Sequence, residues 1–452
     1  MKRFPHPLAL LVGCVAAASV LTWIIPAGVY DRQEHAATGR MVVVEGTYHR
    51  VEAAPLGPFE AVLAIPKGMI SAADVIFLVL LAGGAFVVIE KAGTLRRFTG
   101  WLAGRLAGRA VLVIPILSLF FGAGGALSHM QEEIVAMVPV LLILSSRLGY
   151  NAMVAAAISI GAAAVGAAFS PFDPFAVLIA QKLAELPAGS GWQLRLAFLA
   201  VAMAIWIGST MRYARASGTG HRASEDEVST TSEWSAIPET DDRLRGTDFA
   251  ILLVIAAAFA TFVTGSLRFH WDFVQIAAVF FVMGLLSGLI GRLGFSGTMA
   301  AYAEGFAAMA YAAVLIGFAR AIFVVLDEGR IIDSIVHGIF TPIRGLPPAL
   351  AAQAMMAAHV GVHVPVPSVS GHAVLTMPVL VPLSDLMGMS RQVSVMAYHY
   401  GAGLCELITP TNGALMAVLG AAGIGYDQWI RFVAPRFLAL LALGAVGLFV
   451  AL

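Results

Sequence analysis

Apolar residues occur along this chain in long blocks, with the charged residues gathered between them. Helices need about 20 apolar residues to cross a bilayer, and most of these blocks approach or reach that length. A soluble helical protein would show charged helix faces, which these blocks do not have. The pattern therefore predicts an all-α polytopic membrane protein. The apolar blocks are residues 8–25, 75–89, 152–169, 196–208, 249–263, 273–290, 306–326 and 432–452.

Two other regions have the pattern of short apolar helices joined by a polar tip. In the first, a short apolar segment at 111–121 is followed by a Gly-rich tip and a second short segment that ends near 145. The second has a tip at 365–372, rich in Pro and Ser. Irregular backbone at membrane depth is tolerated only where it is buried in protein or lines a cavity. We therefore predict two re-entrant hairpins, at about 110–146 and about 347–386.

One stretch of the chain occurs twice. Residues 137–179 match residues 376–418 without a gap, so that Pro378 follows Pro139 by 239 positions. At the same shift Ser170-Pro171 falls on Thr409-Pro410, and Asp173 falls on Asn412. Each copy predicts a long helix that is broken by a polar Pro-containing segment, over 151–184 and 391–421. Paired, interrupted membrane segments in corresponding positions of two halves indicate a transporter binding site.

Positive residues give the expected topology. Lys2 and Arg3 place the N-terminus in the cytoplasm, and residues 26–71 then lie outside, with a β-hairpin formed by 41–44 and 48–51. A polar, Arg-containing segment at 212–247 predicts a cytoplasmic linker between a first repeat (1–211) and a second (248–452). The second repeat has an extra span at 273–291, which reverses everything after it. The hairpin at 110–146 is thus expected to enter from the cytoplasm and that at 347–386 from outside, which makes the repeat an inverted one.

Composition agrees with this class and excludes others. The chain is 59% hydrophobic and 12% charged, with a net charge of zero. Nucleic acid is therefore not an expected partner. The two cysteines, Cys14 and Cys405, lie in apolar helical context, which argues against a disulfide or a thiolate metal site.

The two helix breaks and the second hairpin tip supply the main candidate site. Proline removes a backbone donor and opens the helix, which frees carbonyls for a cation and N–H groups for an anion. Plain proline kinks are the structural alternative, but two kinks matched at one repeat offset favour binding. The predicted substrate- and ion-binding residues are Ser170, Asp173, Ser368, Ser370, Gly371, Thr409, Thr411 and Asn412.

A second group of polar residues at membrane depth is also expected to contribute, because such residues are costly there and usually functional. For Glu132 and Glu133, which are adjacent, the alternative is a wet hairpin mouth, and for Arg320 it is a structural ion pair. His359 and His363 have the i, i+4 spacing of metal-binding helices, but no HExxH motif is present. We expect no cofactor and no metal other than Na⁺ at the broken helices. The second group is His129, Glu132, Glu133, Arg320, His372 and Glu406.

At these residues the chain resembles the C4-dicarboxylate anaerobic carrier (DcuC-like) family, within its YfcC-like branch of the ion transporter superfamily. The resemblance covers nearly the whole chain. It implies an elevator mechanism in a homodimer, and the branch is often described as basic amino-acid antiporters. At the presumed site the chain departs from that pattern at Asp173, His372, Ala402 and Glu406. The motifs that carry the resemblance lie at 23–28, 64–68, 317–320, 345–348, 370–378 and 407–413.

The sequence thus predicts a secondary active transporter of the inner membrane and not an enzyme. Its partners are the lipid bilayer and a small polar organic ion, an amino acid or peptide ahead of a C4-dicarboxylate. Transport would be driven by Na⁺ or H⁺ or by exchange. Two alternatives of another class are a membrane-embedded metal enzyme, which stoichiometric zinc would indicate, and a passive channel, which could not accumulate substrate against a gradient.

Overall fold

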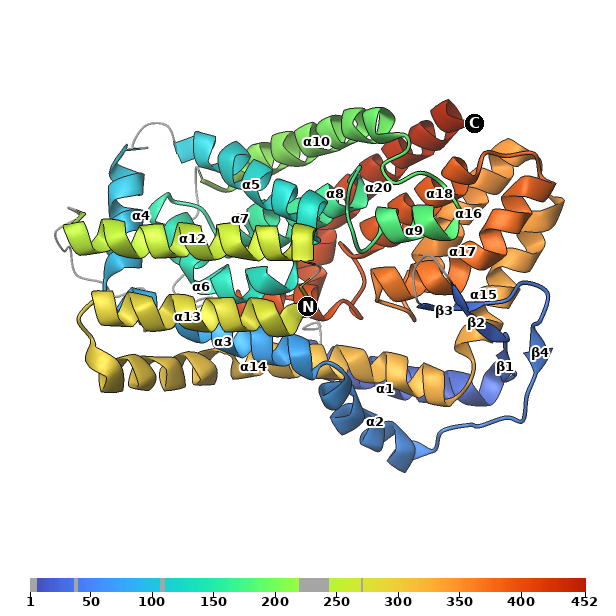
Figure 1. Ribbon diagram of the computed structural model, residues 1–452, viewed down its shortest axis with the longest axis horizontal. Helices are drawn as coiled ribbons and strands as arrows, with labels where there is room; N and C mark the ends of the chain where they lie inside the picture. Colours follow the sequence, from blue (N-terminus) through green and yellow to red (C-terminus); the bar gives the residue numbers. More distant parts are fainter. Residues whose placement is uncertain (1–5, 36–39, 106–109, 219–243, 270) are drawn as a thin grey trace.

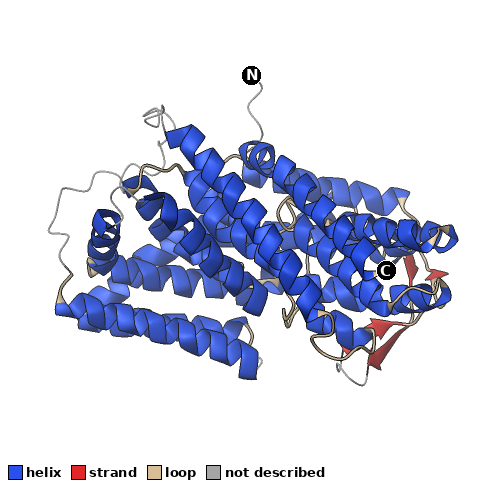
Figure 2. Ribbon diagram, turned by 90° about the horizontal axis from the view of Figure 1, so that it is seen from above, coloured by secondary structure: helices blue, strands red, loops and turns tan. Residues whose placement is uncertain are grey.

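The computed structural model describes residues 6–35, 40–105, 110–218, 244–269 and 271–452. Helices make up most of this part of the chain, and the strands lie together at one end of the molecule (Figures 1 and 2). The predicted all-α polytopic fold is therefore confirmed.

The helices of the first half are α1 (Pro7–Ile24), α2 (Pro58–Ser71), α3 (Ala73–Lys91), α4 (Thr94–Arg105), α5 (Val113–Ser128), α6 (Glu132–Arg147), α7 (Ala152–Ala156), α8 (Ala162–Ala168), α9 (Val177–Leu183) and α10 (Trp192–Gly218). Those of the second half are α12 (Gly246–Phe269), α13 (Phe273–Ile290), α14 (Gly294–Glu328), α15 (Ile332–Phe340), α16 (Pro348–His363), α17 (Val369–Leu386), α18 (Arg391–Cys405), α19 (Gly413–Ala421) and α20 (Tyr426–Ala451).

Seven helices in the described part are long and apolar enough to cross a membrane: α1, α3, α10, α13, α14, α17 and α20. The longest, α14, has 35 residues. At 1.5 Å per residue it extends over about 50 Å, which exceeds the roughly 30 Å hydrocarbon core. It follows that α14 must tilt or project from the membrane, and α3, α13, α2 and α1 pack along its length.

The two halves repeat the same arrangement of helices. The first residue of α12 lies 239 positions after that of α1, and the first residue of α18 lies 239 positions after that of α7. Hairpin helix α5 packs on α8, and its counterpart α16 packs on α18. The other hairpin helices cross between the halves, because α6 packs on α19 and α17 packs on α9. The hairpins α5–α6 and α16–α17 lie toward opposite ends of the long axis (Figure 1), as an inverted repeat requires.

Both long helices that were expected to be broken are broken. In the first half α7 continues through a π-helical segment, Ala157–Gly161, into α8, and the chain becomes irregular before α9. In the π turn the Ala157 carbonyl accepts from the Ala162 backbone N–H, and the Trp206 indole Nε1 also donates to it at 2.9 Å. In the second half the break lies between α18 and α19. Each break thus falls where a Ser-Pro or Thr-Pro pair interrupts an otherwise apolar helix.

The structure corrects two expectations for residues 26–71, the region expected to lie outside. Strand β3 (Arg40–Val43) pairs with β2 (Arg32–His35), and β4 (His49–Arg50) pairs with β1 (Gly28–Val29), so the expected pairing of 41–44 with 48–51 is wrong. The reason is a tertiary anchor, because Asp333 of α15 accepts from the Tyr30 backbone N–H at 2.9 Å and from Arg32 Nη2 at 2.9 Å. In addition, part of the expected loop is helix α2, which begins with Pro58 in the first turn, a position that suits proline.

The linker expectation also needs correction at its ends. Residues 212–218 continue α10, and α12 already begins at Gly246. Residues 219–243 lie outside the described residues. The start of α12 is tied down because Asp248, fully buried, accepts from Thr94 Oγ1 at 2.7 Å and from Arg97 Nη2 at 2.6 Å.

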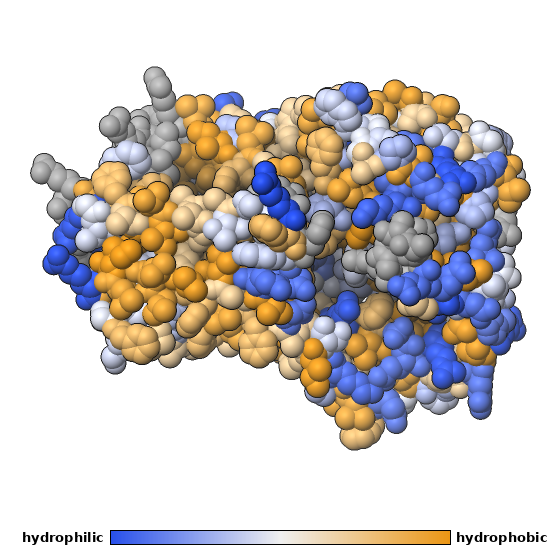
Figure 3. Space-filling model, viewed as in Figure 1, coloured by the Kyte–Doolittle hydropathy of each residue, from blue (hydrophilic) through white to orange (hydrophobic). Residues whose placement is uncertain are grey.

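Surface polarity divides the face seen in Figure 3. Apolar residues dominate over the part that holds α12 and α13, whereas polar residues gather toward the end that carries the strands. An apolar lateral surface is what a helix bundle in lipid requires, while strands need a polar setting or a closed barrel. The strands therefore mark one of the two ends that face water.

Candidate substrate and ion site

Asp173 lies in the first helix break, where one of its two carboxylate oxygens accepts backbone hydrogen bonds. Ser170 Oγ accepts from the backbone N–H groups of Phe172 and Asp173 at 3.0 and 2.8 Å, which holds the turn after Pro171. Asp173 Oδ1 accepts from the N–H groups of Phe175 and Ala176 at 2.8 and 3.1 Å. These bonds satisfy backbone donors ahead of α9. The other oxygen, Oδ2, is not used by the break and is available to side chains from other elements.

The tip of the first hairpin places His129 against that oxygen. His129 ends α5 with φ of 53°, a left-handed conformation in which His is enriched among non-glycine residues. The sharp turn separates α5 from α6 and directs the ring at the break, so that Nδ1 lies 2.6 Å from Asp173 Oδ2. The Asp173 side chain is fully buried and the His129 side chain is 15% exposed. This contact therefore joins the first hairpin to the first break in a nearly dry environment.

The second break is joined to the same hairpin tip. Asn412 caps α19 by accepting from Leu415 N at 3.0 Å, and its amide donates to Gln131 Oε1 at 3.2 Å. Gln131 Nε2 in turn donates to Glu406 Oε2. His129 Nε2 lies 3.4 Å from the same Glu406 oxygen. We call His129, Gln131, Asp173, Glu406 and Asn412 the central polar cluster. Through it, Asp173 and Asn412, the pair related by the repeat, meet at one site.

Three further histidines continue from the cluster; we call His359, His363 and His372 the histidine row. His363 Nε2 lies 3.8 Å from Glu406 Oε1. His363 Nδ1 lies 3.3 Å from His372 Nδ1, and His372 Nε2 lies 2.8 Å from His359 Nδ1. All three side chains are fully buried. Titratable groups thus follow one another from Asp173 to His359.

The histidine row does not form a metal site. Its middle ring uses one nitrogen toward His359 and the other toward His363, so the three rings do not converge on one point. Within the described ranges no group of three or more His, Cys, Asp or Glu side chains is arranged to hold a metal ion. A metal ion needs three or four donors around one centre, and this arrangement does not provide them.

Residues predicted at the second break and second tip hold that region together. Thr409 Oγ1 and Thr411 Oγ1 lie 2.7 Å apart, and Thr411 Oγ1 donates to the Val364 carbonyl at 2.7 Å. Ser368 caps α17 by accepting from Gly371 N at 3.2 Å. Ser370 is only half-buried and has no hydrogen bond to the central polar cluster. The second tip therefore approaches the site through its backbone and through His363 and His372, rather than through its hydroxyls.

The remaining predicted residues form no hydrogen bond or ion pair with the cluster in the described structure. Glu132 is half-buried and Glu133 is buried at the start of α6, where Glu133 Oε2 has no partner in the described structure. Arg320 on α14 donates to Ser71 Oγ at 3.1 Å, and its guanidinium lies 4.8 Å from the centre of the Phe323 ring. Arg320 is therefore not brought together with Asp173 or Glu406.

The structure adds two residues that were not predicted for the site, Gln131 and His363. The repeat carried a signal for the first, because Gln131 precedes the predicted Ser370 by 239 positions and His129 precedes Ser368 by the same shift. His363 carried a different signal, the i, i+4 spacing with His359, which indicated a metal ligand and not a partner of Glu406. Its approach to Glu406 depends on where α16 ends against α18, which only the packed structure decides.

The central polar cluster has two acidic side chains and no Lys or Arg to balance them among the described residues. Asp173 and Glu406 are 0% and 5% exposed, and no Lys or Arg of the described residues forms an ion pair with either. A histidine can donate from both ring nitrogens only as imidazolium, and His129 faces a carboxylate oxygen at each nitrogen. The cluster is therefore suited to hold a proton or an organic cation, and its burial shows a closed site.

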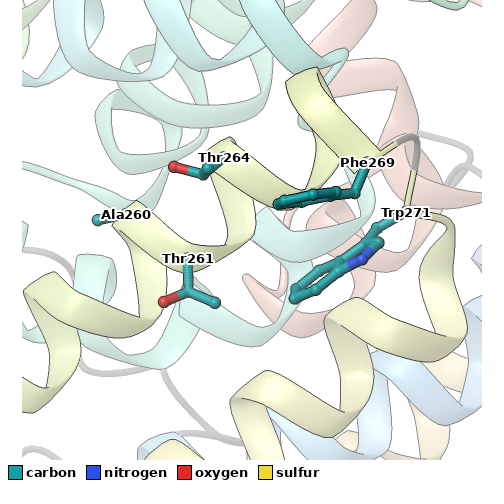
Figure 4. A pocket seen from close by; sticks show the side chains of 6 residues that line it. Ala260, Thr261, Thr264, Phe269 and Trp271 are labelled. Carbon is teal, nitrogen blue, oxygen red and sulfur yellow. The ribbon is translucent and has the colours of Figure 1, made fainter.

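A separate surface pocket of about 270 Å³ lies on α12 (Figure 4). Its lining has no ionisable side chain, and it is not part of the central polar cluster. It therefore has no groups that would select a charged substrate. The lining residues are Ala260, Thr261, Thr264, Gly265, Phe269 and Trp271.

Two hairpins and two interrupted helices that meet at a buried polar cluster define a membrane transporter. The chain belongs to the C4-dicarboxylate anaerobic carrier family, whose model matches residues 4–452, and the resemblance seen in the sequence is confirmed. It is 32% identical over 478 residues to the "Putative basic amino acid antiporter YfcC" of Escherichia coli (strain K12), covering 97% of this chain and 94% of that one. The family consists of transporters, so the protein is not an enzyme.

Two solved transporters are more distantly similar. One is MtrF of Neisseria gonorrhoeae, described as belonging to a class of antimetabolite efflux pumps, at 16% identity and a TM-score of 0.43 over 99% of this chain and 95% of that one. The other is the YdaH transporter of Alcanivorax borkumensis, at 18% identity and a TM-score of 0.46 over 99% and 98%.

Proposed function

We propose that this protein is a secondary active transporter of a small amino-acid substrate that carries a positively charged amine. The observation that carries the proposal is the pair of buried carboxylates, Asp173 and Glu406, with no Lys or Arg paired to either in the described structure. One histidine, His129, faces both carboxylates, so it can balance only one of the two negative charges. A buried carboxylate without a balancing charge is costly, and a bound cation offsets that cost. The Escherichia coli relative carries the name "Putative basic amino acid antiporter YfcC", which agrees with this charge.

A C4-dicarboxylate is the less favoured substrate. Its two negative charges would approach Asp173 and Glu406, and like charges repel strongly in a site of low dielectric constant. Such a substrate would first require both carboxylates to be neutralised. The family description alone therefore does not decide the substrate.

We assign the driving ion to the proton rather than to Na⁺. A sodium site at the breaks would need several free oxygens, but Asp173 Oδ1 and Asn412 Oδ1 cap helices, and Thr411 Oγ1 is bonded to Val364. The Asp173–His129 pair can exchange a proton without any new ligand. In this scheme Glu406 accepts the substrate amine, and Asp173 with His129 carries the coupled proton.

The packing supports an elevator movement. Hairpins α5–α6 and α16–α17 pack with the broken helices α7–α9 and α18–α19, while α1, α2, α3 and α13 pack around α14. The two groups meet mainly where α19 contacts α14 and where α6 contacts α3. We propose that the first group moves as a transport domain along the second, in an inner-membrane homodimer with a cytoplasmic N-terminus.

The direct test is counterflow in proteoliposomes that contain the purified protein. Radiolabelled lysine or arginine should accumulate against internal unlabelled amino acid, and a pH gradient should drive uptake without Na⁺. Accumulation also separates a transporter from a channel. Uptake of succinate with no uptake of amino acids would contradict the proposal.

Substitution of Glu406 tests the residue assigned to the amine. Glu406→Gln keeps the size of the side chain and one carbonyl oxygen but removes the charge. Loss of a charged hydrogen bond, about 1.5–3 kcal/mol, should weaken lysine binding roughly tenfold to a hundredfold. The matched control is Asp248→Asn, a buried carboxylate paired with Arg97 outside the cluster. Equal losses of affinity in both variants would show that Glu406 does not contact the amine.

A further inference from the structure

Arg195, the fourth residue of α10, is fully buried. Its guanidinium is always charged and can only donate hydrogen bonds. Nη1 lies 3.0 Å from His399 Nδ1, whereas Nε and Nη2 have no partner in the described structure. No carboxylate of the described residues forms an ion pair with this guanidinium.

The two unpartnered nitrogens lie on the same edge of the guanidinium. Nε–H and the outer Nη2–H point in parallel, and this edge binds a planar carboxylate through two hydrogen bonds. Because the guanidinium can only donate, His399 Nδ1 must accept, which leaves the proton on Nε2. The Tyr400 hydroxyl is also buried and unpartnered. The set therefore consists of donors around one positive charge, which is the chemistry of an anion site.

Arg436 is an arginine of the same protein whose hydrogen bonds are those of a structural residue. On α20, Arg436 Nε donates to Ser209 Oγ at 3.0 Å and Nη2 donates to the Ser209 carbonyl at 3.0 Å. Its Nη1 is bonded to the Phe432 carbonyl, and the guanidinium lies 3.7 Å from the centre of the Phe432 ring. Every nitrogen of Arg436 is engaged, although Arg436 is less buried than Arg195. An intramembrane arginine whose carboxylate-binding edge stays unsatisfied is thus unlike a structural one.

The position of Arg195 connects it to the proposed site. His399 lies on α18, which ends at Cys405 directly before Glu406, and α18 packs on α8, which ends at the first break. The repeat provides no second copy, because Ala434 occupies the position 239 residues after Arg195. His399 precedes Glu406 by seven residues, which is about 10 Å along a helix. At that separation the Arg195 edge and Glu406 can bind the anionic and cationic ends of one amino acid.

We infer that Arg195, with His399, binds the carboxylate group of the transported substrate. This inference rests on the proposed function, in which Glu406 accepts the amine of the same amino acid. A free small carboxylate or a fatty acid would offer the same chemistry to Arg195, so the test must distinguish these sources.

The test compares binding of L-lysine with binding of L-lysinamide, which lacks the carboxylate, by full-length wild-type protein and by Arg195→Lys. The Arg195→Lys side chain keeps the positive charge but lacks the edge of two parallel N–H donors. In wild-type protein the amide should bind about tenfold to a hundredfold more weakly than lysine, and in Arg195→Lys this difference should largely disappear.

Arg436→Lys is the matched control and should keep the full difference. Tyr400→Phe, which removes only an unpartnered hydroxyl, reports on the site if Arg195→Lys fails to fold, because it should reduce the preference for lysine without lowering the melting temperature.

The outcomes separate this inference from the proposed function. An unchanged preference for lysine over lysinamide in both Arg195→Lys and Tyr400→Phe would overturn the inference, even if amino-acid transport is confirmed. Competition by acetate or by oleate that removes the Arg195 effect without displacing lysine would assign the site to another carboxylate and would also overturn it. If the proteoliposomes take succinate and no amino acid, the proposed function fails, and the same comparison with succinate and its monoamide decides the role of Arg195.

Discussion

At the scale of single residues, Asp173 and Asn412 show how one repeat position has acquired two functions. Both cap the helix that follows their break, Asp173 by accepting from Phe175 and Ala176 and Asn412 by accepting from Leu415. This shared structural task explains why the repeat keeps an acid or an amide here. Only Asp173 adds a charge, and only Asp173 contacts His129.

Asp173→Asn should therefore separate the two tasks. Asparagine keeps an oxygen for the N–H groups of Phe175 and Ala176, so the fold should be retained, but it removes the negative charge beside His129. We expect lysine counterflow to continue while uptake driven by a pH gradient is lost. Parallel measurement of both activities in proteoliposomes checks this, and a loss of lysine affinity at every pH would show that Asp173 binds the amine instead.

The reciprocal variant, Asn412→Asp, tests the opposite half of the site. It replaces the amide that donates to Gln131 Oε1 with a second carboxylate near Glu406, so the bond becomes a repulsion. Lysine binding should be disturbed at neutral pH and recover as the pH falls and one acid is protonated. Transport unchanged in both Asp173→Asn and Asn412→Asp would mean that the breaks are structural kinks.

At the scale of elements, glycines and small residues set how closely the hairpins approach the broken helices. A Cβ at Gly166 on α8 would lie 2.0 Å from the Gly122 carbonyl oxygen of α5, and one at Gly401 on α18 would lie 2.4 Å from the Met356 oxygen of α16. The obstacle is backbone in both cases, so it cannot move aside as a flexible side chain could. The two halves thus use the same device for α5 on α8 and α16 on α18.

Gly166→Ala and Gly401→Ala should each destabilise the protein by about 1–3 kcal/mol or more, because the added methyl group overpacks a helix contact. The first should also displace the α5–α6 tip and weaken lysine binding through His129. Melting temperatures in detergent check the first statement. Gly13→Ala on α1, where a Cβ would meet nothing within 4 Å, is the control and should leave the melting temperature nearly unchanged.

At the scale of the whole molecule, the contact between α19 and α14 is where the proposed transport domain meets the scaffold. A Cβ at Gly413 would lie 3.4 Å from the Ile316 Cβ, close to the separation found in disulfides. The pair Ile316→Cys with Gly413→Cys, in a background without Cys14 and Cys405, should therefore cross-link on oxidation. An elevator predicts that the cross-link stops transport, that binding persists and that reduction restores transport. Full transport by the cross-linked protein would exclude movement at this contact.

Membrane orientation is a second property of the whole molecule. Single cysteines at Glu52, in the strand region, and at Ala216, at the end of α10, occupy exposed positions in the described structure. In intact cells an impermeant thiol reagent should label Glu52→Cys and leave Ala216→Cys protected. The reverse labelling pattern would invert the proposed topology. Thr38 and Ser224 lie outside the described residues.

The sequence alone determined the membrane class, the inverted repeat, the two hairpins and the two breaks. These properties are local or periodic: helix length must match the bilayer, prolines interrupt helices wherever they occur, and a duplicated stretch keeps its register. The repeat also identified Asp173 and Asn412, because the same turn needs the same caps. The predictions of the fold succeed because each depends on a few neighbouring residues and on the number of crossings.

Only the tertiary structure decided which polar side chains meet. The strand pairing of residues 28–50 depends on Asp333, which lies 303 residues after Tyr30. The central polar cluster depends on the crossing of the first hairpin between both breaks. Arg195 and Arg320 are both arginines within apolar helices, yet one has an unsatisfied edge next to His399 and the other rests on Ser71 and Phe323. Sequence pattern cannot separate them, because the energy of a buried charge is set by the groups that packing brings around it.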